Sequence, residues 1–400
     1  MPINLPKKIN NTEEGSVNDD LTKETGSKED SSFEKEKNKD SLPFMEKINN
    51  FLYRFSRVPL KEKLFFVQYL AIMLKSGISL SAGLETLSKQ TPNKFFSKVI
   101  KDVEQKVEKG MSLTESLSSH KKVFGELFIS MIEAGEVSGK LEDILSQLYI
   151  QLKKQHELIS KVRSALTYPA VIVFAMGGIG VFMMVVVVPK LTGMLKEFDA
   201  ELPVITKILI AVSDAIVNNG IFASVAFIIF VISIIQILRT YRGKYYFQAI
   251  LLKFPIISPI VKKINLARFS RIISSLLKTD IMIIKTFEIT ASVLGNLHYR
   301  KAVNDMSERI KKGSQINEVI NIYPSLFPPV VCQIVSVGEE TGELDNMLSE
   351  LADFYEGEVN EIMESLPSII EPLLILVLGS GIGVMAAAIV MPMYSLTSNM

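Results

Sequence analysis

The chain has 400 residues, of which 48% are apolar, and a formal net charge of +1. This apolar content is high for a soluble protein and points to membrane spans, and the near-neutral charge gives no reason to expect a nucleic-acid partner. The single cysteine, Cys332, excludes an internal disulfide, and nothing here requires an oxidising compartment.

The first segment, residues 1–42, is rich in Lys, Glu, Asp, Asn and Ser and poor in large apolar side chains. Such a composition cannot bury enough apolar surface to offset the entropy of ordering, so we predict a disordered polar tail. A partner-binding arm is the alternative for this tail. No apolar stretch typical of a signal peptide follows its basic residues, and residues 43–57 are predicted to form an amphipathic lead-in.

Residues 58–166 are predicted to form a cytoplasmic helical domain. Over residues 60–74, apolar side chains recur at intervals of three and four, which makes one apolar helix face. Gly77 ends this helix, and Ser112 opens a capping-box pattern with Glu115 at the third position. Strand-like alternation is absent, so we expect about six short helices packed as a compact bundle.

Three stretches contain no charged side chain and are long enough to cross a bilayer. They are residues 168–189, 219–238 and 372–393. About 20 residues at about 1.5 Å each match a hydrocarbon core of about 30 Å. A buried helix of a soluble domain is normally shorter and keeps a polar stripe. We therefore predict three transmembrane helices.

Basic residues set the direction of these spans. Residues 239–271 contain eight Lys or Arg and no acidic residue, which places the linker 239–265 in the cytoplasm. The loop 190–218 is short and slightly acidic, which suits the outside. No Lys or Arg follows Lys312, so the direction of the third span comes from counting crossings. The N-terminus is then cytoplasmic and the C-terminus, residues 394–400, external.

An internal repeat decides the architecture. A shift of 203 residues aligns the chain with itself without a gap, pairing GEVSGKL at 135–141 with GEETGEL at 338–344 and Pro169 with Pro372. A match held in one register through soluble and membrane parts indicates a duplication. Residues 266–369 are therefore predicted to form a second cytoplasmic helical domain, and the first and third spans run in the same direction.

The predicted fold class is an all-α integral membrane protein. It has two homologous cytoplasmic helical-bundle domains of about six helices each and three transmembrane helices. Small residues in the first and third spans offer surfaces for close helix packing, including packing in a homo-oligomer, and simple tolerance of glycine in lipid is the alternative. These residues are Gly178, Gly180, Gly381 and Gly383.

No signature of an enzyme stands out, and no catalytic, cofactor or metal site is expected. The string GEVSGK is one residue too short for a phosphate-binding loop, and the second copy has Glu343 in place of the lysine. His120, His156 and His298 are isolated in sequence. Transporters usually place ionisable groups within their spans, whereas here Glu371 only borders one.

The duplicated glycine element resembles that of the GspF/PilC family, the inner-membrane platform proteins of type II secretion systems and type IV pili. It stands as EAGEVSGKL at 133–141 and VGEETGEL at 337–344, and LKSGISL at 74–80 resembles the L-x-x-G-x-x-L segment that opens each domain of that family. The resemblance covers about 58–398. The second copy departs at Asp280, where the first has a glycine, which puts that local turn in doubt.

The motif residues are candidates for a partner contact or for a structural role. In the structural alternative the glycines are helix C-caps, and Ser138 or Thr341 caps the next helix. The candidates are Gly135, Glu136, Gly139, Leu141, Gly338, Glu339, Gly342 and Leu344.

The resemblance implies a multi-pass protein of the bacterial inner membrane without an energy source of its own. Such a platform couples a hexameric assembly ATPase in the cytoplasm to the extraction and polymerisation of pilin or pseudopilin subunits, together with other inner-membrane assembly proteins. The residues do not separate pilus biogenesis from secretion or competence. A small membrane transporter or receptor with helical cytoplasmic domains is the alternative.

The charge distribution suggests two contacts. Residues 239–312 are strongly basic, which predicts attraction to anionic membrane lipid. Residues 343–364 are acidic, which predicts a face for the ATPase or another subunit. Intramolecular neutralisation of the two segments is the alternative.

Overall fold

The described part of the chain is helical. The computed structural model describes residues 58–197 and 204–398, and no strand occurs among them. This confirms the all-α fold class. The tail 1–42 and the lead-in 43–57 lie outside the described residues.

The helices of the first repeat recur in the second at the offset seen in the sequence. The first repeat contains α2 (Leu60–Lys75), α3 (Leu80–Gln90), α4 (Lys94–Glu108), α5 (Leu113–Ser118), the one-turn α6 (Lys121–Phe124) and α7 (Glu126–Ser138). The second contains α13 (Ser258–Leu277), α14 (Ile283–Val293), α15 (Leu297–Lys311), α16 (Ile316–Asn321) and α17 (Pro329–Thr341). From α3 and α14 onward, the four matching pairs begin and end 203 residues apart. The duplication is confirmed.

Matching residues start matching helices. The Asn93 side chain accepts hydrogen bonds from the second and third N–H groups of α4 at 3.0 and 3.1 Å, and Asn296 does the same for α15 at 2.9 and 3.4 Å. These bonds satisfy donors that a helix leaves free at its N-terminus. Ser112 accepts from the Glu115 N–H at 3.0 Å, as the capping pattern predicted.

Each repeat packs around three buried aromatic residues in equivalent positions. They are Phe66, Phe96 and Phe124 in the first repeat and Phe269, Tyr299 and Phe327 in the second. The Tyr299 hydroxyl donates to the Leu326 carbonyl at 2.8 Å, so its polar atom is satisfied inside the core. Burial raises the pKa of Tyr299, so this donor stays protonated.

Two long helices leave the repeats and continue into the predicted spans. They are α8 (Leu141–Phe182), which passes through a π-helical turn (Met183–Val187) into α9 (Val188–Glu197), and α18 (Leu344–Ser398). The spans predicted to begin at 168 and 372 therefore have no helix start of their own. Pro169 and Pro372 lie inside these helices. Each proline removes one backbone donor, and the helix continues because the other hydrogen bonds of a long helix remain.

The connection between the repeats is helical too. It consists of α10 (Val204–Asn218), α11 (Gly220–Arg239) and α12 (Tyr241–Lys253). The predicted external loop 190–218 thus contains α10, and the predicted linker 239–265 contains α12. Thr206 on α10 donates to the Ala388 carbonyl of α18 at 2.8 Å, which ties α10 to the last span.

Two helices of the described chain are long and apolar enough to cross a membrane, Leu141–Lys190 and Leu344–Ala388. A third follows if the pair formed by α11 and α12, bent by 90°, counts as one span. The bend depends on Gly243, because a Cβ built there would lie 2.0 Å from the Ile237 carbonyl oxygen. Any side chain at this position would open the corner.

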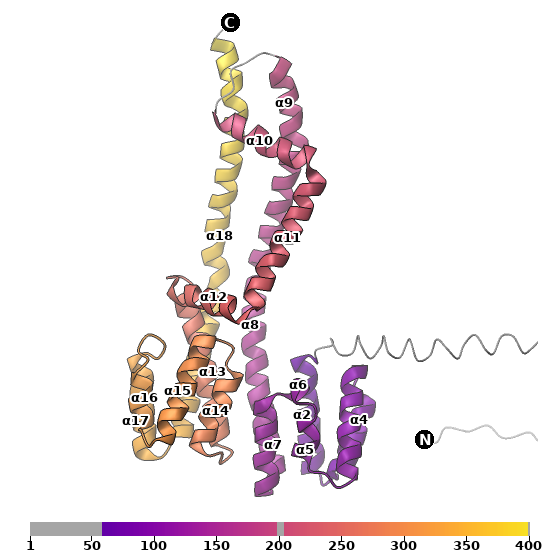
Figure 1. Ribbon diagram of the computed structural model, residues 1–400, viewed down its shortest axis with the longest axis vertical. Helices are drawn as coiled ribbons and strands as arrows, with labels where there is room; N and C mark the ends of the chain where they lie inside the picture. Colours follow the sequence, from indigo (N-terminus) through magenta and orange to yellow (C-terminus); the bar gives the residue numbers. More distant parts are fainter. Residues whose placement is uncertain (1–57, 198–203, 399–400) are drawn as a thin grey trace, which may run out of the picture. The chain divides into compact units, whose positions relative to one another are not determined.

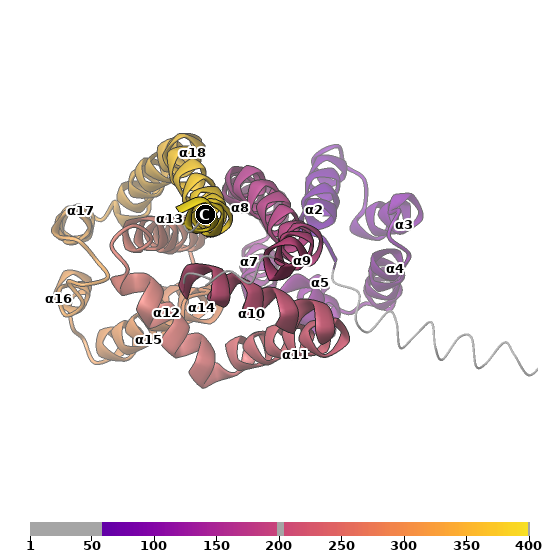
Figure 2. The same cartoon turned by 90° about the horizontal axis from the view of Figure 1, so that it is seen from above.

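The two repeats meet along the lower parts of α8 and α18, which lie side by side (Figure 1). Seen from above, α2 to α5 lie on the far side of α8 from α18, α17 lies beside α18, and α7 and α14 lie next to each other between the repeats (Figure 2). The interface between the repeats thus centres on the two helices that run on into the predicted spans, and α13 against α8 and α14 against α7 extend it.

Candidate functional site

The glutamate of the glycine motif caps a helix in both repeats. The Glu136 carboxylate accepts hydrogen bonds from the Leu113 and Thr114 N–H groups at the start of α5, the second at 2.8 Å. Glu339 accepts from Ile316 and Asn317 at the start of α16, at 2.9 and 3.0 Å. A carboxylate here satisfies two free donors and faces the positive end of the helix dipole. Each glutamate therefore fastens a short helix to the motif.

The motif glycines shape the turn into the long helix. Gly139 and Gly342 end α7 and α17 in the left-handed conformation, with φ of +69° and +76°. A Cβ on Gly135 would lie 3.2 Å from the Leu141 Cα, and one on Gly338 would lie 2.9 Å from the Leu344 Cα. Glycine permits this close approach, so the four motif positions of each repeat shape one corner, and the two corners are equivalent.

The prediction that Ser138 or Thr341 caps the next helix is wrong. The Ser138 hydroxyl donates to the Ala134 carbonyl at 2.7 Å, and the Thr341 hydroxyl donates to the Val337 carbonyl at 2.8 Å. Both hydroxyls donate to a carbonyl four residues earlier in their own helix. The left-handed glycine that follows changes the chain direction, so neither side chain reaches the start of the next helix. A partner contact by the motif stays a prediction.

Asp280 keeps the turn that its substitution for glycine put in doubt. Its φ is +57°, and it is the one non-glycine residue with positive φ in the described chain. The equivalent Gly77 has φ of +80°. Aspartate tolerates the left-handed region better than most residues, so both repeats make the same turn.

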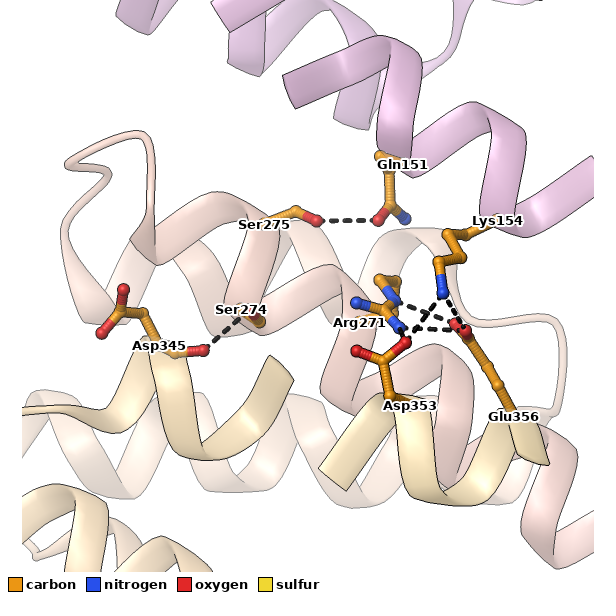
Figure 3. Close-up of polar contacts among 8 residues, drawn as sticks. All are labelled: Gln151, Lys154, Arg271, Ser274, Ser275, Asp345, Asp353 and Glu356. Atoms are coloured by element: carbon orange, nitrogen blue, oxygen red, sulfur yellow. Dashed lines mark hydrogen bonds and ion pairs between the residues drawn. The ribbon is translucent and has the colours of Figure 1, made fainter. Parts of the chain in front are cut away.

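A charged cluster joins the repeats (Figure 3). Arg271 on α13 donates through Nε and Nη2 to Glu356 at 2.8 and 2.9 Å, and through Nη2 to Asp353 at 2.6 Å. Lys154 on α8 donates to the same two carboxylates, at 2.7 Å to Asp353 and 3.2 Å to Glu356. The first repeat thus completes an ion-pair network that the second repeat holds on two of its helices.

The network keeps its members charged. Burial alone would raise the pKa of Asp353, but hydrogen bonds from Lys154 and Arg271 outweigh it and hold the pKa below its usual range. Burial likewise opposes protonation of Lys154 and Arg271, whereas the two carboxylates raise the pKa of both. Beside the network, the Ser275 hydroxyl donates to the Gln151 side chain at 2.8 Å, a second polar bridge between the repeats.

The acidic segment 343–364 has two kinds of carboxylate. Asp353 and Glu356 are paired as described, and Glu358 pairs with Lys263. The prediction that the whole segment faces a partner is therefore wrong for these three residues, since basic side chains of the same chain neutralise them. A second group is exposed and forms no ion pair within the described residues. It consists of Glu343, Glu350, Glu361 and Glu364.

The glycines of the predicted spans are open. A Cβ built on Gly178, Gly180, Gly381 or Gly383 would meet no atom within 4 Å. The described chain therefore does not pack these faces against another of its own helices. Packing against a second copy stays a prediction.

Two of the three isolated histidines have ordinary partners. His120 Nε2 lies 2.7 Å from an Asp102 carboxylate oxygen, and the His298 ring stacks on Tyr245 with 4.2 Å between centroids. Within residues 58–197 and 204–398, no group of three or more His, Cys, Asp or Glu is arranged to hold a metal ion.

Sequence reasoning missed the inter-repeat cluster. Lys154 and Asp353 are far apart in sequence, and their equivalents in the other repeat, Gly357 and Ile150, are uncharged. The repeat pattern therefore hides them. The available signal was Arg271 itself, because a charged side chain in a helix that is mostly uncharged calls for a partner once it is buried.

Comparison with known proteins gives a consistent picture. The family described as type II secretion system protein F matches the chain twice, over residues 66–189 and 269–392. The type IV pilus assembly protein PilC of Thermus thermophilus is 35% identical over 345 residues, covering 85% of this chain and 84% of its own. PilC of Myxococcus xanthus is 32% identical over 342 residues (86% and 82%). The type II secretion system protein F of Aeromonas hydrophila is 26% identical over 337 residues (84% and 87%).

Proposed function

The chain belongs to the type II secretion system protein F family of membrane platform proteins, and from this we propose that it couples a cytoplasmic hexameric assembly ATPase to the extraction and polymerisation of pilin subunits. It is an inner-membrane protein of pilus or secretion machinery. Proteins named for type IV pilus assembly reach identities of 35% and 32%, although two others so named are at 28% and 26%, as are two named for type II secretion; the higher values support a pilus. Pseudopilins would replace pilins in a secretion machine.

The continuity of α8 and α18 carries this proposal. Each helix starts in a repeat domain and runs into a predicted span without ending. A helix of 55 residues at about 1.5 Å per residue reaches about 80 Å, which is enough to cross a membrane and extend well beyond it. A partner that shifts a repeat would therefore also shift the span, and no fuel site in this chain would be needed.

The exposed acids of α18 are the proposed contact for the ATPase. Glu350, Glu361 and Glu364 project within about 60° of one another, at about 100° of rotation per residue. They are exposed and unpaired within the described chain, unlike Asp353 and Glu356. A negative stripe of this kind suits a positive surface and would steer its approach.

The proposed orientation places both repeats in the cytoplasm, the N-terminus inside and the C-terminus outside. The eight basic residues between 239 and 271 support this, since cytoplasmic flanks of spans are rich in Lys and Arg. It requires α11 to cross the membrane in the opposite direction to α8 and α18.

A charge-reversal variant tests the ATPase contact. Tagged E350K/E361K/E364K is expected to recover at least about tenfold less ATPase from native membranes, because like charges facing each other cost several kcal/mol. The matched control reverses two exposed acids of the equivalent helix in the first repeat, E142K/D143K. Unchanged ATPase recovery by the triple variant would contradict the proposed contact.

A further inference from the structure

Arg268 on α13 is a cation without a partner. Its Nε is buried and makes no hydrogen bond, and within residues 58–197 and 204–398 no carboxylate pairs with it. Its neighbour Arg271 takes up both Asp353 and Glu356, together with Lys154. The five charges named here therefore leave one positive charge uncompensated, and a partly buried charge of this kind favours a counter-ion.

A groove opens beside Arg268, between α13 and one face of α8. Its hollow measures about 1270 Å³, including open solvent at its mouth. Arg163 and Arg268 are the charged residues that line it, no acidic residue does, and the rest of the lining is mostly apolar. The apolar lining continues up α8 through Leu166 and Val171 to Phe174, all of which are exposed.

The groove lies at the level where the chain enters the membrane. Arg163 is the last charged residue on α8 before Lys190, so the groove starts beside charge and ends within the predicted span. The nearby α12 leaves α11 at 90° and exposes Tyr241 and Tyr246, and tyrosines are enriched at membrane surfaces. Polar side chains are thus available at the predicted membrane surface, and apolar side chains of the groove lie at the depth of lipid acyl chains.

We propose that this groove holds one anionic phospholipid, with its phosphate on the Arg163 and Arg268 guanidiniums and an acyl chain along Leu166, Val171 and Phe174. A guanidinium binds phosphate through two parallel hydrogen bonds, and the two Nη groups of Arg268 make no hydrogen bond within the described chain. The lipid supplies the counter-charge that the chain lacks. This site depends on the membrane location of the chain and not on the proposed ATPase coupling.

An acidic segment of a protein partner would satisfy the charge but not the rest of the groove. The apolar wall begins at Leu166, just before the predicted span, and reaches Phe174 within it, where a lipid chain is present without recruitment. A single occupant that carries both a phosphate and an acyl chain matches both ends.

The test compares lipid retention by native mass spectrometry of the full chain in mild detergent, titrated with phosphatidylglycerol. R268Q is expected to bind it at least about fivefold more weakly than wild type, the factor expected for one arginine beside anionic lipid. V171W, which fills the groove and leaves both arginines in place, is expected to lose the lipid as well. R309Q, which removes an exposed arginine paired with Asp305, is the matched control and should behave as wild type.

Thermal unfolding separates the lipid from other anions. Without lipid, R268Q should unfold at or above the wild-type temperature, because it removes an uncompensated charge. Phosphatidylglycerol should stabilise wild type and not R268Q, while phosphatidylcholine and inorganic phosphate should stabilise neither. Equal retention by wild type and R268Q, or equal stabilisation by phosphatidylcholine or by phosphate alone, would overturn the proposal. So would destabilisation of R268Q in the absence of lipid, since it would reveal a protein partner for Arg268.

Discussion

Replacing Arg271 by methionine should destabilise the second repeat by about 2 kcal/mol. Removing one partner of a buried ion pair costs about 3–5 kcal/mol, because the other charge is left uncompensated. The Arg271 side chain is 10% exposed and Glu356 is 16% exposed, so this pair approaches that case. Asp353 is half exposed, however, and Lys154 still reaches both carboxylates. We therefore expect about half of the full cost.

A substitution of Lys154 provides the comparison for R271M. Its side chain is 35% exposed, and partly exposed pairs contribute at most about 1 kcal/mol. K154M should thus lower stability by about 0.5–1 kcal/mol, less than R271M. In a double-mutant cycle, R271M and E356Q should show a coupling energy of about 1–2 kcal/mol, since both remove the same interaction.

The chain carries its own reporter for this experiment. Cys332 on α17 is the only cysteine and is buried, so a thiol-reactive dye reads out the opening of the second repeat. At about 2–4 °C per kcal/mol for domains of about 150–250 residues, R271M should lower the midpoint of dye labelling by about 4–8 °C. A midpoint within about 1 °C of wild type, or a larger shift for K154M than for R271M, would refute this account of the cluster.

Three further predictions follow from the local geometry. The pKa of Asp353 is lowered on folding. Its contribution to stability is therefore present above its unfolded pKa of about 3.9 and is lost as the pH falls through the folded value. The difference in unfolding free energy between wild type and D353N should be full at pH 6 and should disappear as the pH falls below about 4. E136Q should cost about 1 kcal/mol in thermal unfolding, because the amide keeps one acceptor oxygen and loses the charge that strengthens both hydrogen bonds to α5, and no change would contradict the capping role. D280G should be neutral or stabilising and D280V destabilising by about 1–2 kcal/mol, since only the β-branched residue is strained at φ of +57°; equal midpoints for the two variants would refute this.

The sequence was sufficient for features that repeat or that depend on local chemistry. The offset of 203 residues predicted the duplicated helices, because equivalent N-cap residues such as Asn93 and Asn296 begin equivalent helices. The left-handed turn at Asp280 was harder to predict, since aspartate adopts that conformation only when its surroundings demand it.

Other features depend on how distant helices meet, and the sequence does not contain that information in readable form. The charge-free stretch predicted a separate span that begins at residue 168, but α8 runs through Pro169 because a long helix tolerates the loss of one hydrogen bond. The pairing of Lys154 with Asp353 joins two helices at positions whose equivalents in the other repeat are uncharged, so the duplication gives no sign of it. The division of the acidic segment into paired and exposed carboxylates depends on the same contact.

The most direct test of the platform role is mass spectrometry of the proteins that co-purify with a tagged copy of the chain extracted from its native membrane. We predict recovery of an assembly ATPase together with pilins, after mild cross-linking and with other membrane complexes intact. Pseudopilins in place of pilins would keep the platform role and assign the chain to a secretion machine. Recovery of neither the ATPase nor either class of subunit would contradict the account.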